Sequence, residues 1–207
     1  MKRKENLTLR KVRALETKKL IFDSAIKLIN EKGYDGVSID DITTQAGTAK
    51  GTFYIYFKNK EHIILERFKK IDNAYLRFFK KLNKNQPASQ NLLSFVKDQQ
   101  KFALSNFGLE LLKVVYISQL TPNKEKIFLA DENRVLYKIV DEIINRGQQE
   151  GEFRKDISAK ELTSLVTFMM RSFLYEWCIN DGKFDLIETG QRFFSMFIND
   201  MLKSRPT

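Results

Sequence analysis

The sequence predicts an all-α fold of about nine helices, and three observations lead to that prediction. Apolar residues recur every three or four positions along most of the 207-residue chain, which is the period of a helix buried on one face. No segment shows the sustained apolar–polar alternation of a half-buried strand. The three prolines, Pro87, Pro122 and Pro206, all lie outside the helical segments. A chain of this length can bury a sizeable core in one or two domains.

The first helix is predicted by four apolar residues and a glycine. Ile21, Ala25, Leu28 and Ile29 fall at i, i+4, i+7 and i+8, so they lie on one face of a helix. Gly33 then supplies the stop, because glycine readily adopts the left-handed backbone that ends many helices.

Residues 38–57 are predicted to form two short helices joined by a tight turn at Gly47. Ser38 can cap the first helix, with Asp41 three residues on as in a capping box. Six apolar residues can close a small core: Val37, Ile39, Ile42, Ala46, Phe53 and Phe57. Five others are left pointing outward: Lys50, Thr52, Tyr54, Tyr56 and Lys60. This pattern is typical of a helix-turn-helix, whose second helix can lie in the DNA major groove.

The remaining two thirds of the chain are predicted to form a helical bundle. One long helix is expected over residues 61–83, followed by a polar loop around Pro87. Further helices are expected at about 91–106, 109–118, 123–150, 158–180 and 185–203. Ser158 and Glu161 form a second capping box at the start of one of them, and Asp185 can cap the last.

Positive charge is concentrated at the N-terminus. The formal net charge is +10, and residues 1–20 hold eight basic side chains against two acidic ones, whereas residues 21–60 hold five of each sign. A basic arm beside a helix-turn-helix is typical of proteins that contact DNA phosphates. A solubilising basic tail is the other interpretation.

Two stretches closely resemble the signature of TetR-family transcriptional regulators. They are residues 46–61, AGTAKGTFYIYFKNKE, and the lead-in ETKKLIFDSA at 16–25 with EKGY at 31–34. The resemblance covers about residues 14–66. It implies a basic arm at 1–13, a DNA-binding domain at 14–74 and a ligand-binding and dimerisation domain at 75–207. It also implies a homodimer that binds a palindromic operator on double-stranded DNA and is released by a small effector.

The DNA contacts expected on this basis lie on and around helix 48–57. Lys50 and Thr52 are expected to reach base edges or the adjacent backbone, and Gly51 either allows close approach of DNA or packs tightly within the protein. Phosphate contacts are expected from Tyr54, Tyr56 and Lys60, and from Thr17 and Ser38 at helix N-termini. The full predicted set is Thr17, Ser38, Thr48, Lys50, Gly51, Thr52, Tyr54, Tyr56 and Lys60.

Two positions depart from the common family pattern. Ile55 stands where histidine is frequent, and Ala49 stands where serine or proline is frequent, so each loses a polar contact. Ile55 either touches a thymine methyl group or packs within the protein.

Catalysis, metal binding and membrane insertion are not expected. His62 is the only histidine, which removes His-based metal clusters and makes a Ser-His-Asp triad improbable. There is no glycine-rich phosphate loop and no apolar run near the length needed to span a bilayer, so we expect no cofactor and a cytoplasmic protein. The lone Cys178 is interpreted as a small core residue rather than a redox sensor.

Aromatic residues at helical spacing in the second region predict either an ordinary core or an aromatic-lined ligand cavity. The candidates for such a cavity are Phe68, Phe95, Phe102, Tyr116, Phe128, Tyr137, Phe173 and Trp177. Because few charges interrupt these faces, an apolar or amphipathic effector is expected.

The last two helices carry apolar residues on more than one stripe, so each must be buried on most sides. An isologous dimer with a four-helix interface satisfies that requirement. The interface is predicted to include Phe168, Phe194, Phe197 and Met201.

Together these features predict a homodimeric, ligand-responsive repressor. A nucleoid-associated DNA-binding protein that acts through a protein partner is the main alternative. A helical enzyme or small-molecule carrier that has lost DNA binding is a second, and activation of transcription in place of repression is a third.

Overall fold

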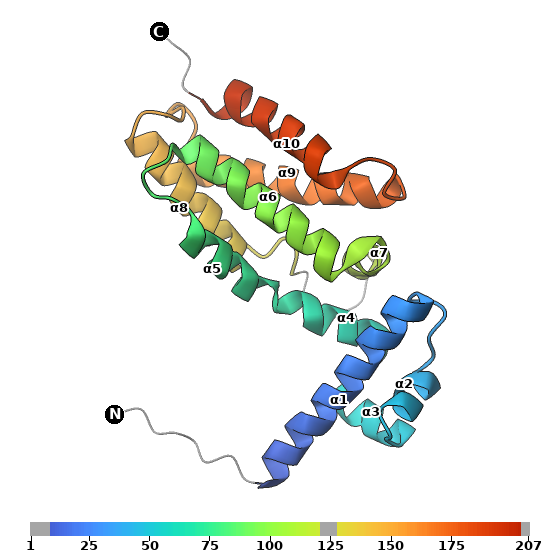
Figure 1. Ribbon diagram of the computed structural model, residues 1–207. Coiled ribbons are helices and arrows are strands. Elements are labelled where there is room, and N and C mark those ends of the chain that lie inside the picture. Colours follow the sequence, from blue (N-terminus) through green and yellow to red (C-terminus); the bar gives the residue numbers. More distant parts are fainter. Residues whose placement is uncertain (1–8, 121–127, 204–207) are drawn as a thin grey trace. The chain divides into compact units, whose positions relative to one another are not determined.

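The computed structural model describes residues 9–120 and 128–203, and these residues are almost entirely helical. They form ten α-helices and a terminal π-helical turn, with one isolated β-bridge between Phe153 and Lys203. The all-α prediction is confirmed. The chain divides into two compact units between Phe68 and Lys69 (Figure 1).

The first unit contains α1 (Leu9–Lys32), α2 (Ile39–Gln45), α3 (Lys50–Tyr56) and α4 (Lys60–Lys69). Helix α1 packs against α2 and α3. The small core expected under the helix-turn-helix is present, since Val37, Ile42, Ala46, Phe53 and Phe57 are all buried.

Two features of this unit differ from expectation. Residues 9–13 belong to α1 although they were predicted to lie in an arm, and the rest of that arm, residues 1–8, lies outside the described residues. Ile39 is only half-buried, because it is the first residue of α2 and the core begins with Ile42 one turn later.

The turn between α2 and α3 is closed by backbone hydrogen bonds. The Gly47 N–H donates to the Thr44 carbonyl at 3.1 Å, and the Thr48 N–H donates to the Thr43 carbonyl at 2.9 Å. This pair of bonds is a Schellman motif, which needs a left-handed residue after the helix end. Gly47 provides it with φ of +60°, so the sequence places glycine where a side chain would be strained.

The long helix expected over 61–83 is two helices. Helix α4 ends at Lys69 and α5 (Ile71–Lys81) begins after Lys70, whose backbone has φ −81° and ψ −5°. Neither proline nor glycine marks the interruption, and apolar residues continue on the same spacing through it. The residue pattern therefore contains no signal that could have revealed it.

The second unit is a bundle built around α6. It comprises α5, α6 (Ala88–Asn106), α7 (Gly108–Leu120), α8 (Val135–Gln149), α9 (Ala159–Ile179), α10 (Leu186–Phe197) and the π-turn η1 (Ile198–Leu202). Helix α6 contacts α5, α7, α8 and α10, and α8 packs along α9 (Figure 1). Fully buried side chains such as Phe95, Val140 and Val166 fill the space between them.

Helix α8 begins twelve residues later than the helix predicted to start at residue 123. Residues 121–127 lie outside the described residues, and residues 128–134 form turns. The Asp131 carboxylate accepts from the Asn133 N–H at 3.0 Å, and the Arg134 N–H donates to the Asp131 carbonyl at 3.1 Å. Aspartate that bonds its own neighbouring backbone favours a turn over a helix.

The last predicted helix, 185–203, is α-helical only as far as Phe197. From Ile198 the backbone widens into a π-turn, and the Lys203 N–H donates to the Ile198 carbonyl at 3.1 Å. The segment is then fastened to the loop before α9, because the Arg154 N–H donates to the Leu202 carbonyl at 2.8 Å.

Two close approaches tie this bundle together. A Cβ on Gly190 of α10 would lie 2.2 Å from the Gln100 side chain of α6, and a Cβ on Gly147 of α8 would lie 2.2 Å from the Phe153 ring. None of the helices in residues 9–120 and 128–203 is long and apolar enough to span a membrane.

Candidate nucleic-acid interface and ligand site

Helix α3 is oriented by its buried aromatic residues. Phe53 is buried within the helix and Phe57 is buried directly after it, and their rings lie 5.8 Å apart. This arrangement turns the opposite side of the short helix outward. Lys50, Gly51, Tyr54 and Ile55 are exposed there, Tyr54 by 52% and Ile55 by 75%.

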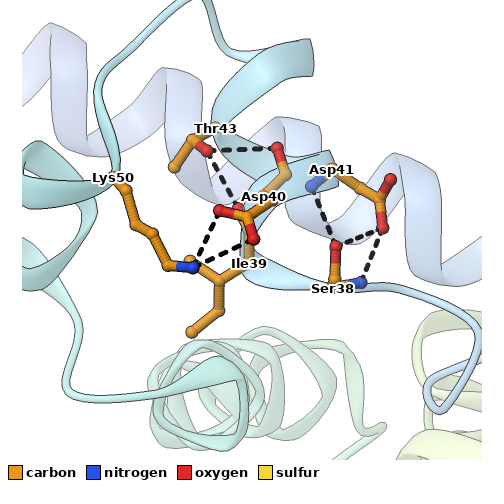
Figure 2. A network of polar contacts seen from close by, with 6 residues as sticks. All are labelled: Ser38, Ile39, Asp40, Asp41, Thr43 and Lys50. Atoms are coloured by element: carbon orange, nitrogen blue, oxygen red, sulfur yellow. Dashed lines mark hydrogen bonds and ion pairs between the residues drawn. The ribbon is translucent and has the colours of Figure 1, made fainter.

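Lys50 forms an ion pair with Asp40 across the helix-turn-helix. Its Nζ lies 2.9 Å from the Asp40 carboxylate, which comes from the first turn of α2 (Figure 2). The hydrogen bond from Lys50 to Asp40 raises the pKa of the Lys50 ammonium. Because both side chains are exposed, the ammonium is positioned by Asp40 and stays accessible to an anion.

Ser38 forms the expected capping box with Asp41. The Asp41 N–H donates to Ser38 Oγ at 3.1 Å, and the Ser38 N–H donates to Asp41 Oδ2 at 2.8 Å (Figure 2). The same hydroxyl donates to Asp41 Oδ2, and these bonds lower the pKa of the Asp41 carboxyl. The Ser38 hydroxyl is thus engaged in stabilising α2.

Thr17 does not lie at a helix N-terminus. It lies in the middle of α1, and its hydroxyl donates to the Arg13 carbonyl at 2.9 Å. The expectation about its place in the helix is wrong because α1 already includes Leu9, eight residues earlier in the chain.

Lys60 points inward, contrary to prediction. Its ammonium donates to the carbonyls of Tyr34 and Val37, the latter at 2.6 Å, and lies 4.2 Å from the centre of the Tyr34 ring. Partial burial lowers the pKa of this ammonium. Lys60 therefore joins the start of α4 to the loop before α2, a tertiary contact that spans more than twenty residues.

The other predicted DNA-contact residues lie on or beside the exposed side of α3. Thr52 and Tyr56 are half-buried, as is Thr48, whose hydroxyl has no hydrogen-bond partner within the described residues. A Cβ on Gly51 would meet open space, so tight packing within the protein does not explain this glycine. Close approach of DNA to this glycine stays a prediction.

The second unit contains a groove of about 620 Å³ between α5, α6 and α8. Apolar side chains of Phe79, Leu82 and Ile143 contribute to its wall. Its charged lining residues are Lys84, Lys138, Asp141, Glu142 and Arg146, and its amides are Asn91, Asn145 and Gln149. Residue patterns did not reveal this groove, because its lining combines α8 with single residues of α5 and α6 and with the loop between those two helices.

Two polar clamps hold α8 and the segment before it, one to α5 and the other to the loop between α5 and α6. Arg134, which precedes α8, donates to Asp72 in the first turn of α5 at 2.6 Å. Near the other end of α8, the Arg146 guanidinium donates to the Lys84 carbonyl at 3.2 Å and to the Gln86 carbonyl at 2.9 Å. The groove lies beside the second clamp, which shares Lys84 and Arg146 with its lining.

None of the eight aromatic candidates lines this groove. Phe68 belongs to the first unit, and Phe95 and Phe102 lie in a chain of ring contacts with Tyr75, Phe78 and Phe107. These residues therefore act mainly as core.

The other candidates have polar or ring partners of their own. Tyr116 donates to the Arg171 carbonyl at 2.8 Å, and Arg171 donates to the Tyr137 hydroxyl. The Phe128 ring lies 5.8 Å from the Arg134 guanidinium, and Trp177 Nε1 donates to the Phe184 carbonyl at 3.1 Å. Phe173 stacks on the Phe193 ring and meets the Phe194 ring edge-on, and both rings belong to α10. These contacts do not gather the eight residues around one cavity.

The predicted dimer residues fall into two groups. Phe168 on α9 and Met201 are exposed and Phe197 is half-buried, and Leu165 and Ile179 on α9 and Met196 on α10 are further exposed apolar residues. Phe194, only 1% exposed, packs against Phe173 and Phe193 within the protomer. Phe194 is therefore a core residue, and its place in the predicted interface is wrong.

Family comparisons agree with the helix-turn-helix. Residues 21–66 match the family described as bacterial regulatory proteins, tetR family, and residues 80–200 match the C-terminal region of YsiA-like proteins. The chain belongs to the TetR family. It is accordingly a DNA-binding transcriptional regulator that responds to a ligand, and the helix-turn-helix described above is its DNA-binding element.

Relatives of this TetR-family chain match it over most of its length. The fatty acid metabolism regulator protein of Bacillus subtilis is 26% identical over 183 residues, which are 86% of this chain and 92% of that protein. FadR from Bacillus subtilis in complex with stearoyl-CoA is 24% identical, with a TM-score of 0.65 and coverage of 88% and 98%. Thermus thermophilus FadR in complex with lauroyl-CoA is 18% identical, with a TM-score of 0.68 and coverage of 91% and 97%. The two structures show the fold.

Proposed function

We propose that this TetR-family regulator is a homodimeric repressor whose effector is a fatty acyl thioester or a closely related amphipathic anion. The groove between α5, α6 and α8 is the observation that carries this proposal, because its lining combines apolar side chains with three basic and two acidic residues and so keeps a net positive charge. Its volume lies within the roughly 300–1,000 Å³ of typical small-molecule sites. The likeness to a fatty acid metabolism regulator supports the same chemical class.

The groove suits the two ends of such a ligand. Phe79, Leu82 and Ile143 offer apolar contact to a hydrocarbon chain. The ammonium groups of Lys84 and Lys138 are available for phosphate or carboxylate oxygens at the same site. Two related structures hold an acyl-CoA, stearoyl-CoA in one and lauroyl-CoA in the other, and both are ligands of the proposed class.

The clamps give the effector a way to act on DNA binding. A ligand in the groove contacts α5 and α8 beside the Arg146 clamp, so it favours whichever separation of these helices fits it best. Helix α5 follows α4 after the single residue Lys70. A shift of α5 is therefore passed through Lys70 to α4.

On the DNA side, the exposed side of α3 supplies the contacts. Lys50, held by Asp40, and Thr52 are proposed to reach base edges or the nearby backbone. Tyr54 and Tyr56 are proposed to contact phosphates. Lys60 has a structural role, because its ammonium binds the carbonyls of the loop that precedes Ser38. The apolar surface of α9 and α10 is proposed to bury itself in a second copy.

An operator-release experiment tests the proposal. Operator DNA is first selected from genomic fragments, and its affinity is then titrated with palmitoyl-CoA, free coenzyme A or palmitate present. We expect palmitoyl-CoA to weaken operator binding by at least tenfold and free coenzyme A to leave it unchanged. Operator DNA must weaken palmitoyl-CoA binding by the same factor, because coupling is reciprocal.

Variants locate the effector site. The double variant Lys84→Ala with Lys138→Ala is expected to bind operator as wild type but to need at least tenfold more palmitoyl-CoA for release. Lys160→Ala, an exposed lysine on α9, is the matched control. Wild-type release by the double variant would place the effector elsewhere. Operator-independent binding at many unrelated sites, with no release by any of the three ligands, would favour the nucleoid-associated alternative.

Variants of α3 test the DNA contacts. Lys50→Ala and Tyr54→Ala are expected to weaken operator binding by about tenfold or more while leaving the melting temperature nearly unchanged, since both side chains are exposed. Wild-type affinity in both variants would show that another side of the unit faces DNA.

A further inference from the structure

Ile55 occupies an unusual place for a large apolar side chain. It lies on α3 and is 75% exposed, whereas Phe53 and Phe57 on the other side are buried. The core beneath α3 is thus complete without Ile55. The alternative that this residue packs within its unit is excluded, because a residue with three quarters of its surface exposed contributes little to packing.

A second observation marks the same side of the helix. Gly51 precedes Ile55 by four residues, so the two positions are neighbours on the helix surface. A Cβ on Gly51 would meet open space, so the helix surface beside Ile55 is bare backbone with no side chain above it. Lys50 and Tyr54 border this place with polar groups that are also exposed.

The chemistry of an isoleucine limits what it can recognise on DNA. It has no hydrogen-bonding group, so it cannot read the donors and acceptors of base edges. The apolar feature of the major groove is the C5-methyl group of thymine, which aliphatic side chains contact. A single exposed isoleucine is common on protein surfaces and alone means little. Its place on the outward side of the recognition helix gives it a defined partner.

We propose that Ile55 recognises thymine in each operator half-site through contact with the C5-methyl group. This inference rests on DNA binding through α3, which belongs to the function described above. It assigns a specificity role to a residue that departs from the family pattern, and it predicts that each half-site holds a thymine where Ile55 meets the major groove.

Replacing thymine by uracil tests the contact directly, because the two bases differ only in the C5-methyl group. Operator DNA obtained by selection from a random double-stranded library is remade with uracil at one symmetric pair of thymines at a time. Burying a methyl group contributes about 0.8 kcal/mol, which corresponds to about fourfold in affinity. At one pair of positions we expect wild-type protein to lose about fourfold per half-site and about fifteenfold in all.

The variant Ile55→Ala should bind the thymine operator more weakly and show no more than about a twofold difference between thymine and uracil at that pair. Ile55→Val, which keeps a branched apolar side chain, should retain most of the difference. Ile117→Ala removes a similarly exposed isoleucine from the second unit and should behave as wild type.

Two results would overturn the inference. One is equal affinity of wild-type protein for thymine and uracil at every position of the half-site. The other is undiminished discrimination by Ile55→Ala. Either result leaves DNA binding itself intact, whereas failure of selection to yield any operator would count against the function described above.

Discussion

Gly51 is a residue at which we expect the needs of binding and of stability to conflict. It lies at the second position of α3 with open space where a Cβ would project. Glycine within a helix is about 0.5–1 kcal/mol less favourable than alanine. Stability alone would therefore favour alanine at this position, and DNA approaching the backbone provides a reason for glycine.

Gly51→Ala is accordingly expected to raise the free energy of unfolding of the first unit by about 0.5–1 kcal/mol and to weaken operator binding by about tenfold or more. Chemical denaturation and operator titration measure the two effects. If the alanine variant is more stable and binds DNA normally, the backbone at residue 51 does not approach DNA.

Lys60 and Ser38 show which residue roles could be predicted. The Ser38–Asp41 capping box depends on residues three apart, so the sequence pattern was sufficient. The inward turn of Lys60 depends on carbonyls of Tyr34 and Val37, whose positions are set by folding. A lysine beside a helix-turn-helix is equally consistent with phosphate contact, and only the tertiary structure separates the two roles.

One helix start in each unit is capped by a serine, and only Ser38 forms the reciprocal capping box, because the bond from the Glu161 side chain back to Ser158 is not among those of the described residues. Ser38 begins α2, and Ser158 begins α9 by accepting from the Glu161 N–H at 3.2 Å. Replacing either serine by alanine removes one cap and is expected to cost about 1 kcal/mol of stability. Replacement by glycine should cost only a few tenths of a kcal/mol.

The two caps are expected to differ in their effect on DNA. Ser38→Ala should also weaken operator binding, because α2 carries Asp40 and thereby positions Lys50. Ser158→Ala should leave operator affinity unchanged at temperatures well below unfolding. Calorimetry together with DNA titration tests both variants. Equal operator affinities of the Ser38→Ala and Ser158→Ala variants would show that the Ser38 cap does not influence DNA binding.

At the level of elements, the sequence predicted helices reliably and their junctions less so. Helical period and caps located α6, α9 and the start of α10, because these signals are local. The break at Lys70 and the turn after residue 128 were missed, since neither contains proline or glycine. The groove could not be predicted, because it exists only where three separately predicted helices pack together.

For the whole molecule, the apolar surface of α9 and α10 predicts dimerisation. Phe168→Asp places a charge on a side chain that is 55% exposed, so the protomer should fold but remain monomeric. Leu104→Asp, on the exposed side of α6, is the matched control and should stay dimeric. Sedimentation at micromolar concentration distinguishes the two. A dimer of both Phe168→Asp and Met196→Asp would refute the interface.

One thiol and two phenols that are shielded from water lead us to expect a loss of stability in alkaline solution. Burial raises the pKa of the Cys178 thiol to about 11 from its ordinary 9.0, and the pKa values of the Tyr34 and Tyr75 phenols to about 12 from 10.0. Each folded-state pKa is raised, so the neutral form is favoured in the folded protein. The resulting stability is present below pH 9 and is lost as pH rises through 11 to 12.

We therefore expect the melting temperature to stay level between about pH 7 and 8.5 and to fall progressively above about pH 9–10. Melting followed by circular dichroism, with phenolate absorbance recorded in parallel, measures this. Ionisation of all seven tyrosines near pH 10 while the protein remains folded would show that the Tyr34 and Tyr75 phenols are not protected.

The contacts that Leu202 and Lys203 make with residues 153–154 affect the order in which the two units fold during synthesis. The ribosome delivers the chain from its N-terminus, so every residue of the DNA-binding unit emerges before α10 exists. The second unit cannot close until α10 reaches α6 and the last turn pairs beside Phe153. A newborn chain thus acquires its DNA-binding helices while the proposed dimer surface on α9 and α10 is still incomplete. Limited proteolysis of stalled nascent chains should accordingly show protection first in residues up to Phe68.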